Sequence, residues 1–324
     1  MARGDRSEQL DSVVNAILAH PEAPVPDVDE SVAALTSIAV ALRDLPRPDF
    51  RTSLRKELIR RATMPVAQKA EPVSYRRQGF RTVTPYLIAA HGEEMIDFVK
   101  NVFGAEELSR DIGSAGGYHC ELRLGDSMLM LGGGAAYKGP SSPGSIHLKV
   151  DNVDEVYRRA LEAGATSLHA PTDMDYGERG ASFRDPFGNN WYPATPHAKT
   201  HFLPEMGTVT PYLHPKGADK MIEFLKQAFG AEEVERYAPA GRIEHAKVRV
   251  GDSIVEMGEA HGQYEPLQST FFVYVENTDE AYNRALAAGA TSLTAPADQP
   301  YGHRTAGVRD AFGNTWYLAT QIAK

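Results

Sequence analysis

Residues 184–192 read RDPFGNNWY, and residues 309–317 read RDAFGNTWY. Other stretches return with the same spacing, which is 126 residues early in the repeat and 125 residues later. They are TVTPYL at 82–87 and 208–213, FGAEE at 103–107 and 229–233, H-x-x-x-R-x-GDS at 119–127 and 245–253, and AGATSL at 163–168 and 288–293. A long repeat of this kind indicates a duplicated structural unit. We therefore expect two copies of one module.

Within each copy, the hydrophobic periodicity predicts strands and helices in a fixed order. In the first copy, a strand at 82–88 precedes an amphipathic helix that ends at Gly104. Strands at 106–111, 118–124 and 127–131 complete a βαβββ unit, and the residues from 145 to 194 repeat the same order. The expected fold class is therefore α+β, with each module pairing its own two βαβββ units into a U-shaped cleft.

The repeat divides the chain into three parts. We expect a small all-helical N-terminal extension at 1–75, a first module at 80–198 and a second module at 206–324. The extension has apolar residues at helical spacing, and its third segment is basic, with Arg51, Arg55, Lys56, Arg60 and Arg61. Such a segment can form a bundle on the first module, dock a partner through its basic face, or stay disordered.

The composition limits the classes of function. The 324 residues are 42% hydrophobic and carry a formal net charge of −9, which argues against nucleic acid or an anionic membrane as the main partner. The single cysteine, Cys120, excludes an intramolecular disulfide framework and a multi-cysteine metal cluster. The N-terminal residues lack the apolar core of a signal peptide, and no apolar stretch is long enough to span a bilayer. A cytoplasmic location is expected.

In combination, the repeated motifs resemble those of the vicinal oxygen chelate superfamily, which includes glyoxalase I, extradiol dioxygenases and bleomycin-binding proteins. The resemblance covers roughly residues 80–324 and implies two tandem glyoxalase-like modules. The H-x-x-x-R-x-GDS stretches and the YGxR turns at 176–179 and 301–304 are most similar to its PhnB-like branch. Because this superfamily hosts several chemistries, the fold by itself assigns no reaction.

The resemblance also implies four strand positions at which metal-dependent members carry His, Gln or Glu ligands. Only Glu256 is a suitable ligand at these positions, since the hydroxyl groups of Thr, Ser and Tyr substitute poorly for imidazole or carboxylate. We therefore expect no cofactor. The alternative is a divalent metal, held either by His119, Glu121 and His147 in the first copy or by Glu244, His245 and Glu256 in the second. The matching positions are occupied by Thr84 and Thr210, Met130 and Glu256, Ser145 and Thr270, and Tyr192 and Tyr317.

Candidate ligand-binding residues come from the strands and turns that would face the two clefts. The sequence assigns no catalytic residue among them, and it leaves open whether the protein is an enzyme. The candidates are Tyr86, His119, Met130, Arg179, Trp191, Tyr192, Tyr212, His245, Glu256, Arg304, Trp316 and Tyr317.

Several of these candidates have a structural alternative. Arg179 and Arg304 can clamp an anionic ligand, or they can brace their turns against Asp185 and Asp310. Trp191 and Trp316 can stack on a planar ligand, or they can lie in the core. His119 and His245 can bind a ligand, bind a metal or hydrogen-bond within the sheet.

Three functions are consistent with these observations. The first is metal-independent binding or sequestration of a small, aromatic or drug-like molecule. The second is a metal-dependent lyase, dioxygenase or thiol transferase with non-standard ligands. The third is an interaction or regulatory protein that acts through the N-terminal helices. In each case the chain is expected to be a fused pseudo-dimer, either self-sufficient or paired as a homodimer.

Overall fold

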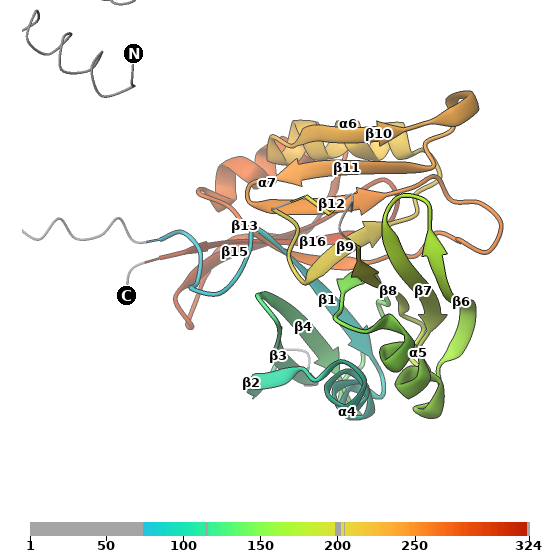
Figure 1. The fold of residues 1–324 in the computed structure, drawn as a ribbon. Coiled ribbons are helices and arrows are strands. Elements are labelled where there is room, and N and C mark those ends of the chain that lie inside the picture. The colour runs from blue at the N-terminus through green and yellow to red at the C-terminus, as the bar shows by residue number, and fades with distance from the viewer. Residues whose placement is uncertain (1–73, 114–115, 198–201, 204, 323–324) are drawn as a thin grey trace, which may run out of the picture. The chain divides into compact units, whose positions relative to one another are not determined.

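The computed structural model describes residues 74–113, 116–197, 202–203 and 205–322 (Figure 1). All but the last two residues of the expected helical extension at 1–75 lie outside this range. We call residues 80–198 module one and residues 206–324 module two.

Module one has the predicted order of strands and helices, so its βαβββ repeat is confirmed. The helices begin and end close to the predicted positions because their apolar faces and caps are local features. Its elements are β1 (Val83–Ala89), α4 (Gly92–Phe103), β2 (Glu106–Ile112), β3 (Tyr118–Leu124), β4 (Ser127–Gly133), β5 (Ser145–Lys149), α5 (Val153–Glu162), β6 (Thr166–Met174), β7 (Glu178–Arg184) and β8 (Asn190–Pro196).

Module two repeats this order and adds one short 3-10 helix, η1 (Pro239–Gly241). Its α7 begins at an Asn277 side chain that accepts hydrogen bonds from the backbone amides of Asp279 and Glu280, as expected of an N-cap. Its other elements are β9 (Val209–Leu213), α6 (Ala218–Phe229), β10 (Glu232–Tyr237), β11 (His245–Val250), β12 (Ser253–Met257), β13 (Thr270–Tyr274), α7 (Thr278–Ala287), β14 (Thr291–Gln299), β15 (His303–Arg309) and β16 (Thr315–Gln321).

The strands form two eight-stranded sheets, and each sheet takes half of its strands from each module. Sheet A has the order β14-β15-β16-β13-β1-β4-β3-β2, and sheet B has the order β10-β11-β12-β9-β5-β8-β7-β6. Figure 1 shows this exchange, because blue β1 lies beside orange-red β13. Our expectation that each module pairs its own two units was therefore wrong.

The exchange is fixed by two antiparallel strand pairs, β1 with β13 and β5 with β9. In the first pair Thr84 lies opposite Phe272, and in the second Thr210 lies opposite His147. The first strands of the two modules share the sequence TVTPYL. Since β1 and β9 would offer β5 nearly the same edge, the local sequence does not determine which of these two strands β5 joins.

The repeated GDS motif holds the two modules together. Asp252 accepts a hydrogen bond from the backbone amide of Thr82 at 2.8 Å, and Asp126 accepts one from Thr208 at 2.7 Å. The preceding Gly251 must be glycine, because a Cβ there would lie 2.3 Å from the Thr82 hydroxyl. This motif therefore stabilises the junction between modules.

Each module has its own hydrophobic core, on the side of the sheets that its helices cover. Trp191 lies in the core of module one and Trp316 in the core of module two, both with no exposed surface. Since successive strand residues point to opposite faces, alternate residues of the same strands lie on the helix-free faces. We call these face A, on sheet A, and face B, on sheet B.

Candidate functional site

Face A carries an aromatic cluster that is separate from the two cores. Its buried members are Phe80, Met128, Met130, Tyr274 and Ala319, and the partly buried Tyr75, Tyr86 and Phe272 pack against them. Tyr317 lies beside this cluster, with its ring centroid 6.4 Å from that of Tyr86.

The ring of Tyr86 lies flat against the neighbouring strand because residue 132 is glycine. A Cβ on Gly132 would come within 2.8 Å of the Tyr86 hydroxyl oxygen. That oxygen lies 3.0 Å from Nδ1 of His119, and the two rings meet edge to face. The close approach of β4 therefore fixes an aromatic side chain and a hydrogen-bonding imidazole next to one another.

The polar end of face A is an ion pair between Arg77 and Glu121. The two terminal guanidinium nitrogens, Nη1 and Nη2, donate to the carboxylate at 2.5 and 2.9 Å. Nε2 of His119 lies 3.6 Å from the same carboxylate. Burial favours the neutral acid, but hydrogen bonds from His119 and Arg77 outweigh it and lower the pKa of Glu121 to about 2. The carboxyl group is therefore ionised at neutral pH.

Face B has a charged centre in place of the aromatic cluster. His147 Nδ1 lies 2.6 Å from Glu256 Oε2, and His245 Nε2 lies 3.2 Å from Glu256 Oε1. Glu178 approaches the other nitrogen of His147 at 3.7 Å. Burial alone would lower the pKa of His147, but the charge of Glu256 outweighs it and the pKa is raised. His147 and Glu256 therefore form a buried ion pair.

Aromatic rings surround one end of face B. The imidazole of His214 is stacked between the rings of Tyr212 and Tyr264, with centroid distances of 4.7 and 5.2 Å. The ring centroid of Tyr192 lies 5.3 Å from that of Tyr212. The sequence analysis missed His214, although it stands where module one has Ile88, and that difference between the repeats was a readable signal.

Face A does not fit the metal that the family resemblance implies. Met130 and Tyr317 occupy two of the implied ligand positions, and Phe272 stands where face B has His147. None of these side chains is an imidazole or a carboxylate. The implied ligand positions on this face therefore lack the groups that divalent metals require, and the His119 and Glu121 side chains are already bonded to Tyr86 and Arg77.

Face B has donor groups of the right type, but they bond directly to one another. Two ligands of one tetrahedral metal, bound at about 2.1 Å, stand roughly 3.4 Å apart. The 2.6 Å between His147 and Glu256 is too short for a metal to bridge them. Among the described residues, no group of three or more His, Cys, Asp and Glu side chains is placed to hold a metal ion.

The candidate residues are divided between the two faces. His119, expected as a partner of His147, lies on sheet A, whereas His147 lies on sheet B and meets Glu256 of module two. Glu244 pairs with Arg242 and His261 and does not join Glu256. Face A holds Tyr86, His119, Met130 and Tyr317, and face B holds Tyr192, Tyr212, His245 and Glu256.

The two tryptophans do not line either face, which corrects their inclusion among ligand-binding candidates. Each indole lies in a core and donates to a buried aspartate at 2.9 Å, Trp191 to Asp185 and Trp316 to Asp310. Because Tyr192 follows Trp191 directly, alternation along the strand places the tyrosine on the helix-free face and the tryptophan on the other.

Arg179 and Arg304 brace the structure, but through other partners than those expected. Arg179 donates bidentate hydrogen bonds to the carboxylate of Asp154, at the start of α5, and a further hydrogen bond to Asp173. Arg304 does the same with matching residues of module two. Asp185 is not available to Arg179, because its carboxylate already accepts hydrogen bonds from backbone amides and from Trp191.

Sequence reasoning also missed residues that come from outside the repeated motifs. Arg77 precedes the first strand and reaches Glu121 on face A. The ring of Phe202, from the linker between modules, lies 5.0 Å from that of His147 on face B. Neither position is conspicuous in the sequence, because its role depends on which sheet its neighbouring strand joins.

Comparison with known proteins agrees with this architecture. A 120-residue stretch is 36% identical to uncharacterized proteins of Mycobacterium bovis and Mycobacterium tuberculosis, covering 34% of this chain and 79% and 71% of those proteins. Glyoxalase I from Zea mays has a similar fold, with a TM-score of 0.54 and 14% identity over 73% of this chain and 92% of that one.

Two further results concern membrane-spanning helices and family membership. In the described residues, no helix combines the length and apolarity needed to cross a membrane. The sequence model of one superfamily matches residues 81–192 and again residues 213–318, so it covers both modules. The chain therefore belongs to the Glyoxalase/Bleomycin resistance protein/Dioxygenase superfamily.

Proposed function

We propose that this protein binds a small, flat, largely apolar molecule on face A, without a metal ion. The aromatic cluster carries the proposal, because it occupies the sheet positions at which metal-dependent relatives are expected to hold ligands. Tyr86, Phe272 and Tyr317 are only partly buried, so their rings are accessible for stacking. Within the superfamily we place the chain in the PhnB-like branch, on the strength of its H-x-x-x-R-x-GDS and YGxR motifs.

The polar end of face A would orient the ligand. His119 is hydrogen-bonded to Tyr86 and lies near Glu121, so its imidazole can hydrogen-bond to a polar group of the ligand. Arg77 holds Glu121 ionised, so a ligand that carries a hydrogen-bond donor at this end would be preferred. The aromatic rings supply contact area and the polar end supplies direction.

Calorimetric titration with a panel of planar aromatic compounds tests this proposal. Tyr317→Leu is expected to weaken binding about three- to tenfold, because an aromatic pair contributes about 0.5–1.5 kcal/mol beyond buried area. Tyr192→Leu, at the matching position of face B, is the control and should leave the affinity unchanged. Equal weakening by both variants, or no binding of any compound, would contradict the proposal. The affinity should also be the same with and without a chelator.

A second candidate function is metal-dependent catalysis on face B, and one observation favours it. His147, His245 and Glu256 gather there from two modules. A divalent metal acting as a Lewis acid would have to displace the direct contact between His147 and Glu256 to use them as ligands. Elemental analysis after loading with Mn, Fe, Co, Ni and Zn separates the candidates. One metal per chain that is lost in Glu256→Met, but kept in Glu121→Gln, would favour metal-dependent catalysis.

A further inference from the structure

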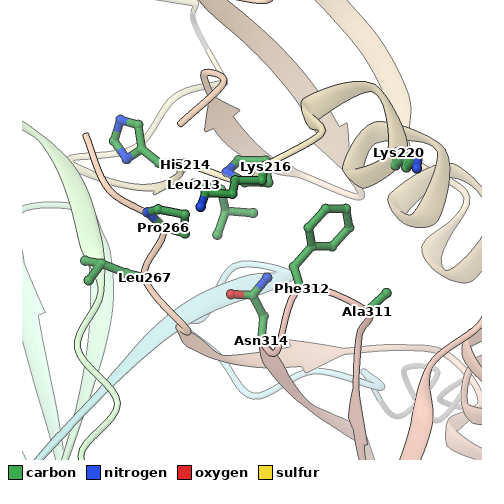
Figure 2. Close-up of a pocket in the computed structure, with 10 residues that line it drawn as sticks. Leu213, His214, Lys216, Lys220, Pro266, Leu267, Ala311, Phe312 and Asn314 are labelled. Atoms are coloured by element: carbon green, nitrogen blue, oxygen red, sulfur yellow. The ribbon is translucent and has the colours of Figure 1, made fainter. Parts of the chain in front are cut away.

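Module two contains a pocket of about 390 Å³ that lies outside the aromatic cluster of face A (Figure 2). One wall comes from the segment between β9 and α6, and the other from the turn between β15 and β16. Figure 2 shows Phe312 and Asn314 rising from this turn toward Leu213 and Lys216. The volume is at the small end of the range for ligand sites, which is roughly 300–1,000 Å³.

The inner lining of the pocket is apolar. Leu213 is buried and the ring of Phe312 is partly exposed. Gly217 has a φ of 104°, and a Cβ there would lie 3.8 Å from the Phe312 ring and 3.7 Å from the stem of Lys220. The aliphatic part of Lys220 therefore extends the apolar surface beside Phe312.

The charges at the rim of the pocket are positive and unneutralised. Lys216 and Lys220 are both exposed, and neither forms an ion pair with any described residue. Glu259 is the nearby carboxylate, and it accepts hydrogen bonds from the amides of Gly217 and Ala218 at 2.6 and 2.8 Å. The carboxylate of Glu259 thus binds the amides at the start of α6. The ammonium groups of Lys216 and Lys220 are therefore the groups at the rim that would attract an anion.

His214 borders the pocket, but its imidazole stacks between Tyr212 and Tyr264 on face B and points away from Phe312 and Lys216 (Figure 2). The residue is only 8% exposed, and its Nδ1 has no hydrogen-bond partner among the described residues. Burial, and then the nearby His261, lower the pKa of His214 to about 4, so the ring is neutral at pH 7.

The matching residues of module one have different chemistry. An offset of 126 aligns His214 with Ile88, Lys216 with Ala90 and Lys220 with Glu94, whereas Phe312 has the counterpart Phe187. The aromatic side of the site is thus common to both modules. The cationic groups at its rim belong to module two alone.

We propose that this pocket binds a small anion with a flat apolar body, such as an aromatic carboxylate. The anionic group would lie between Lys216 and Lys220, and the body would lie against Phe312 and Leu213. This site is separate from the one proposed on face A, and the proposal concerns binding alone.

Binding of 2-naphthoate to the full chain, compared with binding of the uncharged 2-naphthamide, tests the proposal. The naphthoate is expected to bind more tightly than the amide. The double variant Lys216→Gln/Lys220→Gln should weaken naphthoate binding roughly three- to tenfold, since each exposed charge pair contributes modestly, and should leave the amide unaffected. Lys226→Gln is the matched control, because Lys226 lies on the same helix but is already paired with Glu223 and Glu233.

A steric variant makes the test independent of charge. Ala311 is exposed at the rim, so Ala311→Trp should fill the pocket and abolish the preference for naphthoate over naphthamide, whereas Pro186→Trp at the matching position of module one should not. Tyr317→Leu separates this site from face A and should leave that preference intact. The proposal is overturned if the preference persists in the double lysine variant, or if Tyr317→Leu removes it.

Discussion

His147 Nδ1 and Glu256 Oε2 lie 2.6 Å apart, although the two residues are separated by 109 positions and belong to different modules. Neither side chain is more than 9% exposed. On face A the equivalent positions carry Phe272 and Met130, which are uncharged. The two faces therefore use the same sheet positions for an ion pair in one case and for apolar packing in the other.

This ion pair gives the first prediction. His147→Phe or Glu256→Met alone should lower the free energy of unfolding by about 3–5 kcal/mol, because each removes one member of a buried ion pair. The double variant, which carries the side chains found on face A, should be no less stable than either single variant. Urea unfolding of the four proteins measures the coupling. Strictly additive losses in the double variant would show that the pair does not act as a unit.

The turn at Asp310 gives the second prediction. Its carboxylate accepts four hydrogen bonds, from the amides of Phe312 and Asn314, the Asn314 side chain and the Trp316 indole. Asp310→Ala should lower the free energy of unfolding by about 3–5 kcal/mol, because it leaves buried donors without an acceptor.

Asp298→Ala is the control for the Asp310 variant. Asp298 is 65% exposed and bonds only to Arg304 among the described residues, so its loss should change stability by less than about 1 kcal/mol. Near-ultraviolet circular dichroism should also change in Asp310→Ala, because Trp316 loses its fixed partner. An unchanged spectrum and unchanged stability would disprove this account of the turn.

The third prediction concerns acid stability. The folded pKa of Glu121, about 2, lies below its ordinary value of 4.5. A lowered carboxyl pKa stabilises the folded state fully above the ordinary value, and this contribution is lost as the pH falls toward the folded pKa. The stability difference between the wild type and Glu121→Gln should thus be constant above about pH 5 and shrink between pH 4.5 and 2. A difference independent of pH would contradict the assignment.

The fourth prediction follows from the exchange of strands between sheets. Module one alone, 80–198, has its own core but lacks the partners of β1 and β5. We expect it to form a homodimer in which β1 of one copy pairs with β5 of the other. Light scattering after gel filtration measures its mass, and Asp126→Ala, which removes the bond made to Thr208 in the full chain, should weaken the dimer. A folded monomer would show that a module can close on itself.

The order of elements and the cores could be predicted from the sequence because they depend on local patterns. Apolar spacing placed α4, and Gly104 ended it with a φ of 72°, as its lack of a Cβ allows. The burial of the tryptophans could have been predicted too, since Trp191 and Tyr192 are adjacent and must point to opposite faces.

The pairing of the half-modules could not be predicted in the same way. β5 joins β9 rather than β1, yet both candidate strands read TVTPYL, so the choice depends on the whole chain and not on either edge. The meeting of His147 with Glu256, and the separation of His119 from His147, follow from that choice. The GDS motif was noticed as part of a family resemblance, whereas its hydrogen bonds to Thr82 and Thr208 join the modules.

The exchange of strands also means that the unit that was duplicated is not the unit that forms a face. A substitution at Met130 in β4 alters face A, and one at Tyr192 in β8 alters face B, although both strands belong to module one. The two faces can therefore diverge independently, whereas Leu129 and Trp191 on the other side of the same strands share one core. Transplanting the aromatic face into another protein of this architecture would require residues 75–133 together with residues 270–321, two segments that no single cut of the chain would release.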